Sequence, residues 1–172
     1  MSDKQMLYIF LYINDTPEIM IQSEYNRVTL GSIKVIIRPY VSEDEDVVVE
    51  LWHKCELTRP WNDPRTDIKR KLELDPALLL VGVIDDRVIA TVMGGYDGHR
   101  GWVYYLAVDP SYQRSGYGQQ MMEAIEDKLF AIGCPKINLL IRAENKEVMR
   151  FYQGIGYNTE EIVTMGKRLI ED

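Results

Sequence analysis

The sequence predicts an α/β protein of the α+β kind, in which helices cover both faces of a mixed, mostly antiparallel central sheet. Three apolar runs separated by short polar turns indicate an antiparallel meander within residues 77–108. Amphipathic helical patterns precede and follow that meander. Because a helical crossover to a further strand comes after the hairpins, the sheet is expected to be mixed.

The regular pattern begins at Val35, where VIIRPY is typical of a buried strand. Ser42 and Glu45 have the spacing of a capping box, which predicts the start of a helix. The apolar face of this helix comprises Val47, Val48, Leu51, Trp52 and Cys55. The segment 58–64, TRPWNDP, predicts a loop, and a helix that begins with a proline is expected over residues 64–74.

The second half of the chain contains a long amphipathic helix. Its apolar face comprises Tyr117, Met121, Ile125, Leu129 and Ile132, and Gly133 is a natural end for it. The other expected elements are strands over 77–84, 87–95, 102–108 and 136–143, a helix over 145–153, and one or two strands over 157–169.

The first 34 residues differ from the remainder and are interpreted as an extension to a domain of residues 35–172. They contain an apolar run, Met6–Ile13, followed by a polar and weakly alternating stretch. Extra strands, an arm used in oligomer contacts and a tail all fit this pattern. The sequence therefore assigns no role to the extension, and it leaves a homodimer open.

Composition and charge exclude several classes of protein. Of the 172 residues, 46% are apolar and 27% are charged, which is typical of a globular domain. The net charge of −7 argues against a nucleic-acid partner, because phosphates would be repelled. The longest apolar run is far shorter than the ~20 residues of a membrane-spanning helix, and no secretory signal is expected, so the sequence predicts a cytoplasmic protein with no membrane partner.

The few cysteines and histidines carry no metal-binding or disulfide pattern. There are 2 cysteines and 2 histidines, and none of them has a neighbour at ligand spacing. Cys55 and Cys134 are typical of free thiols in a reducing compartment. No metal is expected.

The most informative stretch runs from Tyr104 to Gln119, where a buried strand and a loop lead to Gly116 and Gly118 at the start of the long helix. Unpaired backbone N–H groups at a helix start bind anions, and glycines let a phosphate approach closely. A pyrophosphate suits this loop best. A dinucleotide fingerprint needs a third glycine after a first parallel strand, and a P-loop needs Lys-Ser/Thr, so neither pattern fits. The alternative is that the glycines only shape a turn.

The six residues Gln113–Gly118, QRSGYG, match the Gln/Arg-x-x-Gly-x-Gly/Ala signature of the GNAT superfamily of N-acetyltransferases. Asn145 and Tyr152, on a short helix followed by a glycine and an aromatic residue, resemble the family's second motif. The order of elements over residues 35–170 is similar to that of the family, and the 58–64 loop resembles that of its bacterial YpeA-like subgroup. The resemblance implies a sheet with a parallel pair of strands that splay apart.

The resemblance implies that acetyl-CoA lies in the cleft between the strands expected at 102–108 and 136–143. The pantetheine arm would pair with the backbone of the first strand, and the pyrophosphate would bind N–H groups of the glycine loop. Nearby backbone N–H groups would also bind the thioester oxygen as negative charge develops on it. The implied cofactor-binding residues are Leu106, Ala107, Val108, Gln113, Arg114, Ser115, Gly116, Tyr117, Gly118, Asn145 and Tyr152.

Attack of an amine on a thioester needs two proton transfers. An alkyl ammonium with a pKa of about 10.4 must lose a proton, and a thiolate whose thiol has a pKa of about 8.5 leaves better when protonated. The resemblance implies Tyr152 as the acid, with Asn145 orienting the cofactor arm or the acceptor. Tyr152 also fits a packing role, because Val148, Tyr152 and Ile155 share helical spacing.

The general base is where the sequence departs from the family, because many members have a glutamate at the position of Tyr104. Other groups fit a base that acts through water, although each also fits a turn, a cap or a solvated charge. These groups are Glu56, Asp63, Asp97 and His99. Tyr104 and Tyr105 are expected to line the acceptor slot. Trp61 and Asp63 are expected beside it, since an indole and a carboxylate suit a cationic amine, and Trp61 also fits a residue that pins the loop to the core.

Three functions follow. The first is an acetyl-CoA-dependent N-acetyltransferase that acts on a primary amine of a small molecule, peptide or protein by direct attack in a ternary complex. The second is a non-catalytic acyl-CoA-binding module or sensor. The third is an interaction protein whose first 34 residues pair with another chain.

Overall fold

The computed structural model describes residues 12–13, 16–17 and 35–170. Residues 35–170 belong to one compact unit, and the short strands β1 (Tyr12–Ile13) and β2 (Thr16–Pro17) pair in an antiparallel ladder in a separate unit. The rest of the N-terminal extension lies outside the described residues, so its role stays a prediction.

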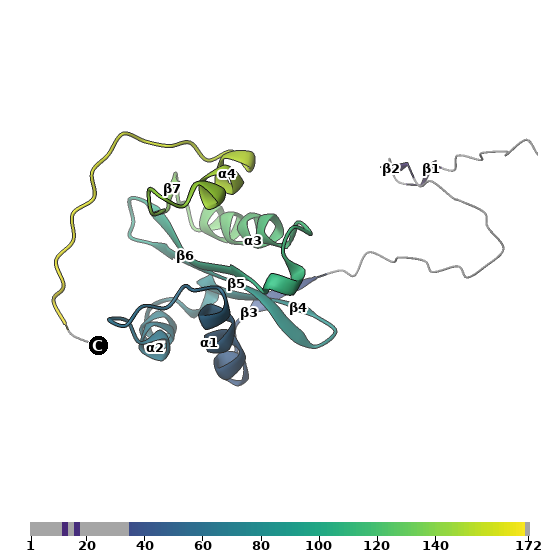
Figure 1. Ribbon diagram of the computed structural model, residues 1–172, viewed down its shortest axis with the longest axis horizontal. Coiled ribbons are helices and arrows are strands. Elements are labelled where there is room, and N and C mark those ends of the chain that lie inside the picture. The colour runs from purple at the N-terminus through teal and green to yellow at the C-terminus, as the bar shows by residue number, and fades with distance from the viewer. Residues whose placement is uncertain (1–11, 14–15, 18–34, 171–172) are drawn as a thin grey trace, which may run out of the picture. The chain divides into compact units, whose positions relative to one another are not determined.

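Five strands form the central sheet in the order β3-β4-β5-β6-β7 (Figure 1). They are β3 (Ile36–Pro39), β4 (Leu79–Ile84), β5 (Arg87–Tyr96), β6 (Gly101–Val108) and β7 (Ile137–Asn138). Every neighbouring pair is antiparallel except β6 and β7, which are parallel. The predicted meander and the predicted mixed, mostly antiparallel sheet are confirmed.

Helices cover both faces of this sheet, as predicted. The helices are α1 (Glu45–Lys54), α2 (Pro64–Leu74), α3 (Tyr117–Ala131) and α4 (Lys146–Gly154), with single 3₁₀ turns at Ser42–Asp44, Pro76–Leu78 and Pro110–Tyr112. Figure 1 shows α1 and α2 on one side of the sheet and α3 and α4 on the other.

Two hydrophobic clusters hold these layers together, one on each face of the sheet. The cluster under α3 includes Met121, Met122, Ile125 and Leu129, together with side chains of β4 and β5. The cluster under α1 and α2 includes Val48, Leu51, Trp52 and Ile68. Strand β4 supplies both clusters, since Leu80 lies in the first and Leu79 and Val81 lie in the second.

The ladder between β5 and β6 contains a β-bulge. Thr91 is paired with Ala107 and Met93 with Tyr104, so that Tyr105 and Leu106 together lie opposite Val92. On its other edge, β6 pairs with β7 only at its first two residues, where Gly101 is opposite Ile137 and Trp102 opposite Asn138. The parallel pair therefore separates after two residues, which is the splayed arrangement that was expected.

Two predictions of strands were wrong. The strand expected over 136–143 is only two residues long, because the chain leaves β6 after Asn138. The segment 157–169 forms no strand, and it runs from α4 as an extended tail, described to Ile170, whose apolar side chains Ile162, Val163, Met165, Leu169 and Ile170 are exposed. A strand requires a partner as well as an apolar sequence, and within the part of the chain that the structure describes neither segment has one along its length.

The expected capping box of Ser42 and Glu45 does not form. The Ser42 hydroxyl donates to Glu43, and the carboxylate of Asp44 accepts the backbone N–H of Val41 at 2.9 Å. Asp44 also accepts two hydrogen bonds from the Arg38 guanidinium, at 2.7 and 2.8 Å. A 3₁₀ turn therefore precedes the helix, which begins at Glu45.

Candidate active site

The loop between β6 and α3 presents an uncapped helix N-terminus. Gly116 is the N-cap residue of α3, and among the described residues no side chain caps the first turn. The other helices that follow long loops are capped, α2 by Asp63 and α4 by Asn145. The backbone N–H groups at the start of α3 are thus left for water or for a ligand.

Two residues of this loop have left-handed backbone conformations. The φ angle is +62° at Arg114 and +81° at Gly116. A Cβ atom added at Gly116 would meet only the Nε2 atom of Gln120, at 3.9 Å, so the space above this residue is open. Gly116 therefore supplies both the turn and the room that an anion would occupy.

The end of β6 is tied to the same loop. The carbonyl oxygen of Val108 accepts hydrogen bonds from the Gln113 side-chain amide at 3.0 Å and from the Cys55 thiol at 3.3 Å. Burial raises the pKa of the Cys55 thiol, so it stays a neutral donor. Ser115 lies within the loop, and its hydroxyl donates to the Gln113 carbonyl at 3.4 Å.

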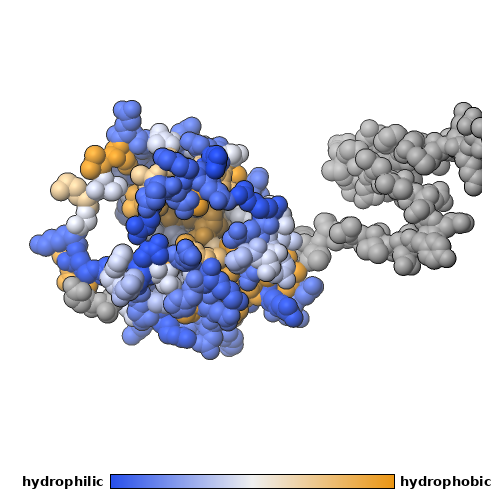
Figure 2. Space-filling view, viewed as in Figure 1, coloured by the Kyte–Doolittle hydropathy of each residue, from blue (hydrophilic) through white to orange (hydrophobic). Residues whose placement is uncertain are grey.

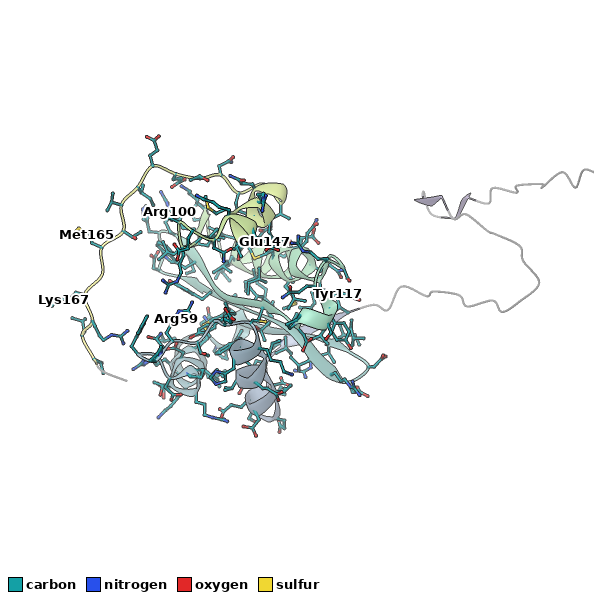
Figure 3. All side chains as sticks on the ribbon, in the orientation of Figure 1. Arg59, Arg100, Tyr117, Glu147, Met165 and Lys167 are labelled. Atoms are coloured by element: carbon teal, nitrogen blue, oxygen red, sulfur yellow. The ribbon has the colours of Figure 1, made fainter. Side chains whose placement is uncertain are left out.

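Helix α4 closes the third side of this region. A Cβ atom at Gly118 would approach the Phe151 ring at 3.3 Å and the Val108 side chain at 3.8 Å, so this glycine lets α4 and β6 approach α3 closely. Arg114 forms an ion pair with Glu147 of α4, and Figure 3 labels Glu147 on α4 and Tyr117 at the beginning of α3. The end of β6, the glycine loop and α4 therefore meet at one place.

Tyr152 lies on α4 with 8% of its surface exposed. Its ring makes edge contacts with Phe151 and Tyr157, at centroid distances of 5.0 and 5.6 Å. Burial raises the pKa of Tyr152 to about 12, so the phenol keeps its proton at neutral pH. It also lines a groove of about 1010 Å³ beside residues 134–141. Both expected roles, acid and packing residue, remain compatible with this environment.

Asn145 caps α4, because its side-chain oxygen accepts the backbone N–H of Val148 at 3.1 Å. Leu106 and Tyr117 are partly buried against the cluster under α3, whereas Ala107 is buried on the opposite face of the sheet. The Ala107 side chain therefore lies on the face of the sheet that α1 and α2 cover.

The geometry fits an elongated ligand that carries amide groups and phosphates. From Val103 onward, the edge of β6 that faces away from β5 has no strand beside it among the described residues. Figure 2 shows a hollow with apolar residues at its floor, between the two helical layers. An open strand edge that leads to an uncapped helix N-terminus provides hydrogen-bonding groups for amides at one end and for phosphates at the other.

The residues expected on the acceptor side lie around the 58–63 loop and β6. Trp61 is 50% exposed, and its two expected roles, beside the acceptor and as a residue that pins the loop to the core, stay predictions. The Asp63 carboxylate accepts the Thr66 hydroxyl and the N–H groups of Arg65 and Thr66, and these bonds hold its pKa below the usual value. The tail reaches this loop, because Arg168 donates to the carbonyl oxygen of Trp61 at 2.8 Å.

The two tyrosines of β6 differ in their surroundings. Tyr104 is 46% exposed, and burial of the remainder, with the charge of Asp97, raises its pKa. It is paired with Met93, which belongs to the cluster under α1 and α2, so Tyr104 lies on that face. The Tyr105 ring stacks on Trp52 and its hydroxyl donates to Asp67 at 2.6 Å.

Each remaining candidate base has a local environment of its own. Asp97 accepts the backbone N–H groups of His99 and Arg100, which lower its pKa and define it as the turn residue of the β5–β6 hairpin. His99 is exposed beside Arg100, and Glu56 has a φ angle of +56° just after α1. No group of three or more His, Cys, Asp or Glu residues in the described ranges could hold a metal ion.

Asp67 and Thr91 were missed by the sequence analysis, although both contact Tyr105. Asp67 lies 38 positions before Tyr105, on another element, and its spacing on α2 carries no signal. Thr91 is a polar residue inside an apolar strand, and that contrast was the available signal.

Comparison with known proteins identifies the family. The model of the Acetyltransferase (GNAT) family matches residues 46–157. The chain belongs to the GNAT family of acetyltransferases. This GNAT chain is 47% identical over 136 residues to an acetyltransferase of Pectobacterium atrosepticum and 46% identical over 136 residues to one of Yersinia pestis, in each case across 79% of this chain and 96% of the relative. The YpeA-like subgroup stays a prediction.

Solved structures show the same fold. The Ard1 protein of Thermoplasma volcanium superposes on the GNAT chain with a TM-score of 0.62, at 23% identity, over 71% of this chain and 81% of that one. An aminoglycoside N-acetyltransferase in complex with CoA gives a TM-score of 0.65, at 19% identity, over 79% and 96%. None of the helices in the described part of the chain is long and apolar enough to cross a membrane.

Proposed function

We propose that this protein transfers an acetyl group from acetyl-CoA to a primary amine, in a ternary complex where the amine attacks the thioester directly. The observation that carries the proposal is the meeting of the open edge of β6, the uncapped start of α3 and the face of α4. Acetyl-CoA supplies an acetyl group activated as a thioester. The resulting carbon–nitrogen bond replaces the carbon–sulfur bond.

The chain provides hydrogen-bonding groups along the length of such a cofactor. Backbone groups of Leu106, Ala107 and Val108 on the open edge of β6 would pair with the amides of the arm. N–H groups from Arg114 to Gly118, with the Gln113 side chain at the start of the loop, would bind the pyrophosphate. N–H groups next to the bulge would bind the thioester oxygen, where negative charge develops during attack.

Tyr152 is the proposed acid for the leaving thiolate. A phenol with a pKa of about 12 is protonated over the whole physiological range, and the thiolate gains that proton as it leaves. Asn145, which begins the same helix, would set the position of α4 and orient the cofactor arm or the acceptor. The amine loses its own proton to water or to a carboxylate that acts through water.

The proposed acceptor is a cationic primary amine, in a small molecule or at a peptide or protein amine. Trp61 and Tyr104 expose aromatic surface on the acceptor side, and aromatic faces attract cations. The net charge of −7 favours approach of cations over anions. A cytoplasmic location, a homodimer, and the expectation of no nucleic-acid and no membrane partner stay predictions.

A non-catalytic acyl-CoA-binding module is the second proposal. It is favoured by the commitment of Asp63 and Asp97 to the first turn of α2 and to the β5–β6 hairpin, because neither carboxylate is free to accept a proton without losing local hydrogen bonds. The two proposals share the cofactor site and differ in turnover.

The deciding experiment combines thermal unfolding with an assay of CoA release. A ligand present at 100 times its dissociation constant adds about 2.7 kcal/mol, which raises the midpoint by roughly 5–10 °C for a domain of this size. We expect that rise with acetyl-CoA and none with NAD at the same concentration. CoA release in the presence of primary amines then supports the acetyltransferase, and its loss in Tyr152→Phe supports the acid.

Binding without release of CoA from any of a broad panel of amines would favour the binding module. No rise in the midpoint with acetyl-CoA would remove both proposals, because both rest on the cofactor site.

A further inference from the structure

We propose that a clamp around Tyr105 holds the bulge of β6 in the shape that acyl transfer needs, and that Trp52, Thr91 and Asp67 act as positioning residues. The inference rests on the proposed function, because it concerns backbone N–H groups of residues 106–108, which begin at the second residue of the bulge. Side chains on the face of the sheet that α1 and α2 cover would thereby determine where those N–H groups point.

The backbone of Tyr105 has a conformation that is unusual for tyrosine. Its φ angle is +50°, in the left-handed region, and it is the first of the two residues that lie opposite Val92. Glycine commonly occupies the left-handed position of such a bulge, because a Cβ atom there is strained. A tyrosine at this position must be held by contacts that outweigh the strain.

Three contacts hold Tyr105, one at each end of the residue and one across its ring. The ring stacks on the Trp52 indole, with centroids 3.8 Å apart and an interplanar angle of 15°. The hydroxyl donates to the carboxylate of Asp67 at 2.6 Å. The backbone carbonyl accepts the hydroxyl of Thr91 at 2.8 Å. Together these contacts fix both the side chain and the peptide plane that follows it.

The carbonyl contact is part of a buried relay. The Trp52 indole N–H donates to the Thr91 hydroxyl at 2.9 Å, and that hydroxyl donates in turn to Tyr105. Trp52 and Thr91 are both 0% exposed, so water cannot replace either bond. The direction of the Thr91 hydroxyl is therefore set by the same indole on which the tyrosine stacks.

The hydroxyl contact connects the clamp to the acceptor side. The side-chain amide N–H of Asn62 donates to the same Asp67 oxygen at 3.3 Å. The side-chain oxygen of Asn62 accepts a hydrogen bond from the Arg168 guanidinium at 3.2 Å. The bulge, the 58–63 loop and the tail are thus linked through one carboxylate. A clamp of this kind would keep the acceptor side and the thioester oxygen site at a fixed separation.

A bulge that only ended the pairing of β6 would need none of these side chains, since a glycine would adopt the same backbone without strain. The combination of a strained residue with three fixed contacts, beside an open strand edge, is the pattern expected where geometry is used in a reaction. The N–H groups of residues 106–108 are the groups whose direction depends on it.

The test compares Thr91→Val with Thr91→Ser. Valine has nearly the same shape as threonine but lacks the hydroxyl, whereas serine keeps it. We expect Thr91→Val to lower kcat about 10- to 100-fold, the effect of misdirecting one oxyanion donor, with the Kd for acetyl-CoA changed less than about 2-fold. Thr91→Ser should recover most of kcat.

A second readout does not depend on turnover. In ¹⁵N NMR spectra of the ligand-free protein, the amide signals of Leu106 and Ala107 should move in Thr91→Val and stay near their wild-type positions in Thr91→Ser. If Thr91→Val fails to fold, Tyr105→Phe tests the same clamp at a half-buried position, by removing the hydroxyl that donates to Asp67.

Equal kcat in wild type and Thr91→Val, with unmoved amide signals, would overturn the clamp, as would equal losses in the valine and serine variants, which would indicate packing alone. A wild-type protein that neither binds acetyl-CoA nor releases CoA would overturn the proposed function instead. The amide signals would then still decide whether the hydroxyl sets the backbone of β6.

Discussion

Gly116 and Gly133 stand at opposite ends of α3 in the same left-handed conformation. Their φ angles are +81° and +83°, and a Cβ atom would meet nothing closer than 3.9 Å at the first and nothing within 4 Å at the second. The two positions therefore carry the same backbone constraint. Only Gly116 lies where the pyrophosphate is proposed to bind.

The pair allows the binding role of Gly116 to be separated from its conformational role. Alanine at either position should lower the free energy of unfolding by about 1 kcal/mol, because a Cβ atom disfavours positive φ. We expect Gly116→Ala to weaken acetyl-CoA binding at least about 10-fold, because the methyl group enters the phosphate space, and Gly133→Ala to leave the Kd unchanged. Calorimetric titration checks this, and equal Kd values in the two variants would contradict the pyrophosphate assignment.

For single residues, local sequence signals were sufficient to predict some roles and contacts and not others. The glycine loop was predictable because its chemistry lies within six consecutive residues, Gln113–Gly118. The contacts of Tyr105 were not, because they join residues that are distant in sequence and depend on a bulge that shifts the register by one residue. The failed capping box shows the same limit, since Arg38, on the preceding strand, orients Asp44.

Strand β5 and helix α3 approach each other closely at one glycine. A Cβ atom at Gly94 would lie 2.8 Å from both Cγ1 and Cδ1 of Ile125, a side chain that is 0% exposed. At Gly95, the next residue on the same strand, a Cβ atom would meet nothing within 4 Å. The distance between these two elements thus depends on the absence of a side chain at Gly94.

We expect Gly94→Ala to lower the free energy of unfolding by about 1–3 kcal/mol, because a methyl group overfills a packed interface. Gly95→Ala should change it by less than about 0.5 kcal/mol, as is usual for substitutions without close neighbours. Urea unfolding of the two variants measures both values. Equal stabilities would show that α3 can move away from the sheet without cost.

Elements that bury an apolar face were predicted well, and strands that need a distant partner were not. The helices α2, α3 and α4 and the meander follow from periodicity and turn residues that lie close together in the sequence. The apolar runs at 139–141 and 162–165 have the composition of strands, yet neither pairs with another segment of the described chain. Strand formation in these runs depends on which edge is available, and composition does not specify that.

For the molecule as a whole, buried tyrosines link stability to alkaline pH. Burial raises the pKa of both Tyr40 and Tyr152 to about 12. Burial and the neighbouring Glu126 raise the pKa of Tyr157 as well. The Tyr40 hydroxyl is buried and has no hydrogen-bond partner among the described residues. All three phenols therefore hold their protons more tightly in the folded chain than in the unfolded chain, where the pKa is about 10.

This difference predicts a loss of stability at high pH. A group whose pKa is raised by folding stabilises the folded state fully below its unfolded pKa, and that contribution is lost as pH rises through the folded pKa. For Tyr152, a shift from 10 to about 12 corresponds to about 2.7 kcal/mol, most of which should disappear between pH 10 and 12. Tyr152→Phe should therefore show a shallower decline of unfolding free energy over this range than wild type.

Tyr40→Phe should show the same change with no loss of stability at pH 7, because its hydroxyl has no partner to lose. Urea unfolding at pH 7, 9, 10 and 11 gives these curves, and curves that stay parallel to that of wild type would mean that the phenols ionise without opposing the fold.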